Sequence, residues 1–216
     1  FYHKLIIPFL IPFLIFMSIG PNLSWIKSEF KIIRIKSIFL FIISLLISSF
    51  ILRKTGLVSL INTVLISAAF YLFFITVKDF FVKKYKNYSQ KISHFGFSLL
   101  ILSILLNSVF SSEIITNLKV GEKFTFKKGS IMFEKVENAE GKNYKSIIGY
   151  FIIEDKKKNY IQLKPELRIY DQPAIVTSEA DIKTTLYSDK FLVINLVKGS
   201  ELFNVRSQIK PFIIWI

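Results

Sequence analysis

Four long apolar segments precede residue 113, and they constrain the fold more than any other feature of the chain. Each approaches the ~20 residues that a helix needs to cross ~30 Å of hydrocarbon, although the first two are somewhat short. The composition agrees, since 52% of the 216 residues are hydrophobic and 23 are Phe. We predict membrane spans at about residues 5–20, 37–52, 57–77 and 93–110.

The first predicted span contains Pro8 and Pro12, which a membrane helix tolerates with a kink. Gly20-Pro21 is expected to end it, and Trp25 lies where an interfacial aromatic belongs. No cleavable signal peptide is evident. Because the chain closes partway into a new apolar segment at residues 211–216, we expect a fragment of a longer polytopic protein that starts a further membrane helix there.

The basic residues of the connecting loops predict the orientation. Cytoplasmic loops carry an excess of Lys and Arg. Nine such residues follow the first and third spans, and two follow the second, so residues after Phe110 are expected outside the cytoplasm. The nine are Lys27, Lys31, Arg34, Lys36, Lys78, Lys83, Lys84, Lys86 and Lys91, and the two are Arg53 and Lys54.

The net charge of +14 does not indicate a nucleic-acid-binding protein, because most of the excess lies in these short loops. The chain has no cysteine, which excludes a disulfide, a thiolate nucleophile or a zinc–thiolate site within it. Any thiol chemistry therefore belongs to a partner.

Residues 113–210 change character and predict an external, mostly antiparallel β domain of about 100 residues. Alternation such as Phe124/Phe126 and pairs such as Ile147-Ile148 favour strands. Strands are expected at 123–127, 130–136, 144–154, 160–163, 191–197 and 202–206, with turns at 137–143 and 155–159. The run Lys156-Lys157-Lys158 is interpreted as a hairpin tip. The predicted fold is an α-helical membrane region (residues 1–112) with this β domain appended.

His94 begins the fourth predicted span and is one of two histidines in the chain. An ionisable group at a membrane edge is costly and is often kept for metal or cofactor binding. One interpretation is an interfacial histidine bonded to headgroups or a neighbouring helix. The other is an axial haem ligand, since imidazole binds iron and Gly96 leaves room for a flat macrocycle. Ser98 and Ile101 share the helical face of His94 but add no obvious ligand.

Other candidate site residues are weaker candidates than His94 for a ligand or catalytic role. His3 is expected on the external side, a ~30 Å core away from His94, so it cannot complete a bis-histidine site. Glu29 and Asp79 are interpreted as loop residues. The β domain holds no histidine and hence no Ser-His-Asp set, and no phosphate-binding glycine loop is present. Catalytic residues are therefore unknown.

A series of short motifs runs through the chain in a fixed order. They are Gly20-Pro21-Asn22-Leu23-Ser24-Trp25, Ser93-His94-Phe95-Gly96, Gly141-Lys142-Asn143-Tyr144, Leu163-Lys164-Pro165-Glu166-Leu167-Arg168-Ile169-Tyr170, Ser178-Glu179-Ala180-Asp181-Ile182 with Leu186-Tyr187, and Lys210-Pro211-Phe212-Ile213-Ile214-Trp215-Ile216. In order and spacing they resemble the C-terminal third of the CcmF/NrfE family, the haem lyase subunits of bacterial cytochrome c maturation. Ser93 for Ala and Lys142 for Pro are mild departures.

The resemblance implies a membrane-embedded haem b with His94 as one axial ligand of the iron and Gly96 beside the cofactor. The family's other membrane ligand, its two external haem-handling histidines and its tryptophan-rich loop would lie upstream. His3 inherits no ligand role, since the family often has Asn there. The membrane haem is thought to reduce the iron of the incoming haem.

The resemblance also implies a multi-pass protein of the bacterial inner membrane, with residues 113–210 in the periplasm. There a complex joins haem through thioether bonds to a Cys-x-x-Cys-His site of apocytochrome c. The implied partners are a haem chaperone, apocytochrome c, a thiol-reducing maturation subunit and membrane lipid. This segment is not expected to be active alone.

Two other functions remain open. The chain could be a non-catalytic membrane scaffold, or a haem transporter component, that docks partners through its β domain. A transporter predicts polar groups at mid-membrane, and no charge pair lies within the spans. Arg168 and Tyr170 share a strand face and are the best candidates for docking. Their alternative roles are pairing with a nearby acid and filling the core.

Overall fold

The computed structural model describes residues 2–20, 30–81, 88–127, 129–155 and 158–216. Predictions that lie outside these residues concern Pro21, Trp25 and Glu29, the loop lysines Lys27, Lys83, Lys84 and Lys86, and Lys156-Lys157. The helices form one compact unit and Ser111–Ile214 form a second.

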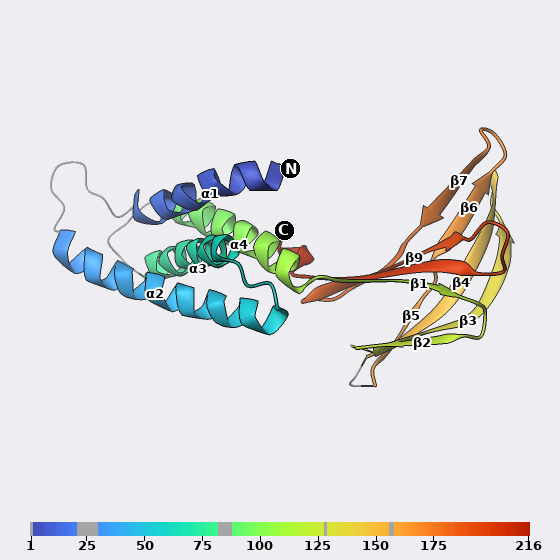
Figure 1. Ribbon diagram of the computed structural model, residues 1–216. Coiled ribbons are helices and arrows are strands. Elements are labelled where there is room, and N and C mark those ends of the chain that lie inside the picture. Colours follow the sequence, from blue (N-terminus) through green and yellow to red (C-terminus); the bar gives the residue numbers. More distant parts are fainter. Residues whose placement is uncertain (1, 21–29, 82–87, 128, 156–157) are drawn as a thin grey trace. The chain divides into compact units, whose positions relative to one another are not determined.

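The helical unit contains α1 (Tyr2–Ile19), α2 (Phe30–Thr55), α3 (Leu60–Phe81) and α4 (Tyr88–Phe110) (Figure 1). Helices are the structure that such sequences adopt in lipid, because every backbone group is then bonded within its own segment. Within the described residues, three helical stretches are long and apolar enough to cross a membrane: Ser37–Thr55, Leu60–Phe81 and Tyr88–Phe110. The apolar part of α1, Leu5–Ile19, is shorter, so a fourth crossing stays a prediction.

Helix α3 is the centre of this unit and contacts α1, α2 and α4. Half of its apolar window is buried, against 17% for α2 and α4. Ala68 and Ala69 are fully buried, and such small side chains let helix backbones approach closely. The core of the unit consists of Leu14, Leu65, Ala68, Ala69, Leu72 and Leu102.

A hydrogen bond joins the buried hydroxyls of Thr76 on α3 and Ser98 on α4 over 2.8 Å. Each hydroxyl also lies 2.8 Å from a carbonyl of its own helix, that of Phe73 or Phe95. The contact ties one turn of α3 to one turn of α4, and thereby sets the register between the two helices.

The second unit is a pair of antiparallel sheets, as predicted. Its strands are β1 (Ser112–Leu118), β2 (Lys123–Phe126), β3 (Gly129–Glu140), β4 (Tyr144–Asp155), β5 (Tyr160–Leu163), β6 (Glu166–Tyr170), β7 (Ile175–Glu179), β8 (Asp181–Thr184), β9 (Ser188–Leu196) and β10 (Phe203–Pro211). One sheet has the order β1-β10-β9-β8. The other has β2-β3-β4-β6-β7, with β5 also paired to β4.

The core of this unit forms from alternate residues of the long strands, because successive side chains of a strand point to opposite faces. Phe133 and Phe151 stack with ring centroids 4.2 Å apart, and both are fully buried. Gly149 lies beside them, and an added Cβ there would come within 2.7 Å of the Phe151 ring. The remaining core residues are Leu118, Ile131, Ile153, Leu163, Leu192, Ile194 and Val205.

Some local predictions were wrong or incomplete. The turn expected at 137–143 is confined to residues after Glu140, because β3 continues in register with β4, from Glu137 opposite Ile148 to Glu140 opposite Lys145. Strands β1, β7 and β8 were not predicted, whereas β6 agrees with the strand expected around Arg168 and Tyr170. A 3-10 helix, Ile213–Trp215, follows β10, and a further membrane helix starting there stays a prediction.

The hydroxyl pair between α3 and α4 should stabilise the helical unit measurably. Thr76→Val keeps the shape of the side chain and removes its hydroxyl, so we expect the free energy of unfolding in bicelles to fall by about 0.6 kcal/mol, typical of interhelical side-chain bonds. Thr63→Val is the matched control on the same helix, since among the described residues the Thr63 hydroxyl bonds the carbonyl of Ser59, just before α3, and no other helix. Equal losses in the two variants would contradict the account.

Candidate functional site

His94 lies in the second turn of α4 and its side chain is half-buried. One turn further on, at i+4, Ser98 is buried and bonds Thr76 of α3. Lys91, at i−3, is buried as well. Residues three and four apart lie on one face of a helix, so His94 belongs to the stripe of α4 that faces α3.

Asp79 was interpreted as a loop residue, but it lies in the last turn of α3. Lys78 and Lys91, also expected in the loop, lie in α3 and α4. The hydrogen-bond ladder of each helix continues past the apolar segment, which is why these residues remain helical. The Asp79 carboxylate interacts electrostatically with Lys78, Lys91 and His94. An acid therefore lies near the candidate ligand, and this proximity was not predicted from the sequence.

Aromatic side chains bracket this end of the α3–α4 pair. The Phe95 ring lies 5.3 Å from the ring of Phe80, edge to face, and 5.8 Å from the ring of Phe73. On α4, Phe97 meets Phe13 of α1 at 6.3 Å. Aromatic pairs of this geometry add to apolar burial, so the turn that carries His94 is held by packing on both sides.

Gly96 is exposed, and an added Cβ would meet nothing within 4 Å. The open space lies about 200° around the helix from His94, because two residues advance an α-helix by that angle. It is therefore not above the imidazole of His94 itself. The part of Gly96 in cofactor binding stays a prediction.

The side chains near this turn of α4 supply one candidate ligand for iron, His94. Among the described residues, no group of three or more His, Cys, Asp and Glu could hold a metal ion. His3 belongs to α1, and the prediction for its side chain lies outside what the structure describes. One imidazole with a carboxylate nearby suits a single axial position of a haem, because ligating histidines commonly donate their other N–H to such a partner. The residues present thus fit one side of the group.

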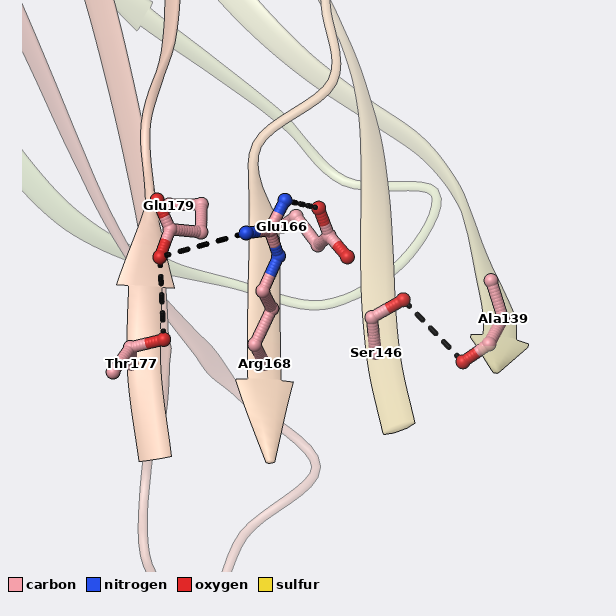
Figure 2. A network of polar contacts seen from close by, with 6 residues as sticks. All are labelled: Ala139, Ser146, Glu166, Arg168, Thr177 and Glu179. Carbon is pink, nitrogen blue, oxygen red and sulfur yellow. Dashed lines mark hydrogen bonds and ion pairs between the residues drawn. The ribbon is translucent and has the colours of Figure 1, made fainter. Parts of the chain in front are cut away.

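Arg168 on β6, the other candidate, is neutralised within its own sheet (Figure 2). Its Nη2 donates to Glu166 at 2.9 Å, and its Nη1 lies 4.0 Å from Glu179 of β7. The guanidinium also stacks 4.9 Å from the Tyr144 ring centroid. Arg168 therefore pairs with acids, the alternative to docking.

Tyr170 does not belong to the core, in contrast to the role considered for it. It is half-buried, and its ring centroid lies 5.4 Å from that of Tyr144, the residue opposite it on β4. The two rings are tilted by 51°, and together with Arg168 they form a row along one face of the sheet. The hydrogen bond from Arg168 holds the pKa of Glu166 below its ordinary value.

Comparisons with known proteins identify relatives of the chain. Residues 109–211 match the family model described as "CcmF C-terminal beta-sandwich". The cytochrome c-type biogenesis protein NrfE of Haemophilus influenzae is 23% identical over 154 residues, which are 71% of this chain and 24% of that protein. CcmF of Pseudomonas fluorescens is 28% identical over 129 residues, 60% of this chain and 20% of the relative.

CcmF of Haemophilus influenzae is 23% identical over the whole chain and 36% of its own length. A solved structure, "Cytochrome c Heme Lyase CcmF", superposes with a TM-score of 0.72 at 14% identity, over 99% of this chain and 37% of that one. This likeness shows that the two share a fold. The chain spans 20–24% of the length of the first two relatives.

Removing the Arg168 side chain should destabilise the unit in a pH-dependent way. Glu166 and Glu179 are directly opposed on β6 and β7, so Arg168→Ala leaves two facing carboxylates. We expect a lower melting temperature than that of the wild type at pH 7 in thermal unfolding. The lowered pKa of Glu166 stabilises the wild type above the ordinary value of 4.5. That contribution is lost as pH falls through the lowered pKa, so the difference between the two proteins should shrink below about pH 4.

Arg206→Ala is the matched control, since Arg206 pairs with the exposed Glu113 on the other sheet and leaves no facing acid. Its effect on the melting temperature should be smaller, because water screens this exposed pair. A loss from Arg168→Ala that persists unchanged at pH 3 would show that packing on Tyr144, and not charge, is what Arg168 contributes.

Proposed function

Since the chain belongs to the CcmF/NrfE family of cytochrome c-type biogenesis proteins, we propose that it is a membrane part of the haem lyase that joins haem to apocytochrome c in the periplasm. The observation that carries the proposal is His94, held on the α3-facing stripe of α4 beside an acid. The activity is that of the whole protein, of which this chain is the membrane and β-domain part.

His94 would hold haem b as one axial ligand, with the second ligand supplied from elsewhere in the protein. In this proposal the residues of the chain bind the haem and orient its ligand. The Thr76–Ser98 contact and the Phe73, Phe80 and Phe95 rings fix the turn that presents the imidazole. When bound, the haem would supply one electron for reduction of the incoming haem iron.

The β unit is proposed to lie in the periplasm among the partners of the reaction: a haem chaperone, apocytochrome c and a thiol-reducing maturation subunit. The thioether bonds would form on cysteines of the apocytochrome, which agrees with the absence of cysteine from this chain. Arg168 supports a structural role for its strand, because its charge is matched by Glu166 and Glu179. Docking by another surface of this unit is compatible with the proposal.

Loss of the imidazole should remove the membrane haem. In full-length protein, His94→Ala is expected to abolish the low-spin b-type absorbance spectrum and to leave the protein folded, because the surrounding apolar packing is unchanged. Ser93→Ala is the matched control, since Ser93 is exposed and its hydroxyl bonds only Ser89 of the same helix; it should keep full haem. Gly96→Ala should lower haem content if Gly96 borders the macrocycle. An unchanged spectrum in His94→Ala would favour the scaffold function.

The proposed orientation predicts which surfaces an impermeant thiol reagent can reach. Ser89 at the start of α4 and Lys198 in the β9–β10 turn are both exposed, and the chain offers no competing cysteine. In intact spheroplasts only Lys198→Cys should be labelled, whereas both it and Ser89→Cys should be labelled after lysis. Labelling of Ser89→Cys from outside would overturn the topology and the periplasmic position of the β unit.

A further inference from the structure

Contacts along the α3–α4 pair show that Asp79 and His94 lie at the same level. Thr76 meets Ser98, and Phe80 meets Phe95, so residue numbers rise along α3 as they fall along α4. Asp79 lies one turn beyond Thr76, and His94 lies one turn before Ser98. Both steps lead toward the same end of the pair, and both stay on the face that carries the hydroxyl contact.

Few charged side chains lie near Asp79 and His94 in the α3–α4 pair. Asp79 is the one acidic residue among the described residues of the four helices. Its side chain is half-buried, and Lys78, Lys91 and His94 are the neighbours that act electrostatically on its carboxylate. An acid at the end of a membrane helix is costly unless a partner compensates it. Lys78 is exposed, which leaves Lys91 and His94 as the partners toward the inside of the helical unit.

A neutral imidazole carries one N–H, and the partner of that N–H decides which nitrogen remains free to bind a metal. A carboxylate acceptor holds the ring in one tautomer and orientation and raises the basicity of the ligating nitrogen. His94 would need such an acceptor to present one nitrogen steadily to iron.

We propose that Asp79 is a positioning residue for His94: its carboxylate accepts the hydrogen bond of one imidazole nitrogen, so that the other nitrogen is directed to the haem iron. Asp79 acts through His94 and touches no reacting atom. The proposal rests on the proposed function, since it presupposes that His94 binds haem, and it adds to that function the group that sets the state of the ligand.

The experiment compares Asp79 variants of the full-length protein purified with its haem. Asp79→Asn keeps the size of the side chain and removes its negative charge. The haem should remain, and its midpoint potential should rise, because a more weakly polarised imidazole stabilises ferric iron less. Asp79→Leu removes the acceptor altogether and should weaken haem binding about 10- to 100-fold. Asp79→Glu should return the potential toward that of the wild type.

Lys78→Gln is the matched control, because it changes the charge by one unit at the neighbouring, exposed position. Its effect on the potential should be much smaller than that of Asp79→Asn. An opposite shift of equal size would mean that charge acts at a distance without a hydrogen bond, and would overturn the proposal.

The role of Asp79 and the ligand role of His94 can be tested separately. If Asp79→Asn and Asp79→Leu keep the wild-type potential and haem affinity while His94→Ala loses its haem, Asp79 is not a positioning residue and His94 is still a ligand. If His94→Ala keeps its haem, the ligand assignment fails, and the role of Asp79 fails with it.

Discussion

The hydrogen bond between Thr76 and Ser98 is the contact that aligns α3 with α4, the two helices that carry the candidate site. Apolar side chains drive helices together only weakly in lipid, since the tails are as apolar as the side chains. They specify register poorly for the same reason. A polar contact between two buried hydroxyls can form in one register alone. It thereby aligns the turn of α3 that holds Asp79 with the turn of α4 that holds His94.

The sequence was sufficient to predict the helices, the antiparallel β domain and the candidate ligand, because each depends on a local pattern. Apolar length indicates a membrane helix, period-two alternation indicates a strand, and His94 is conspicuous in an apolar run. Asp79 was misplaced because hydropathy ends a predicted span where charge begins, whereas the backbone ladder of α3 continues. Antiparallel packing of two successive helices would have brought Asp79 near His94, and that signal was in the sequence.

Strand β7 was missed for a different reason. It shares a network of charges with β6, in which Arg168 lies between Glu166 and Glu179. Such segments show little apolar alternation, so a pattern based on hydrophobicity overlooks them. The stretch around Arg168 is also one of the motifs that resemble the family. Its geometry indicates that the motif joins neighbouring strands, while the haem-related chemistry is proposed for the helical unit.

An experimental structure of the full-length protein isolated with its haem would test the central claim most directly. The account predicts that the iron is bound by one imidazole nitrogen of His94, with the other nitrogen donating to the Asp79 carboxylate. Iron held by ligands that do not include His94 would contradict the account, whatever the position of the β unit.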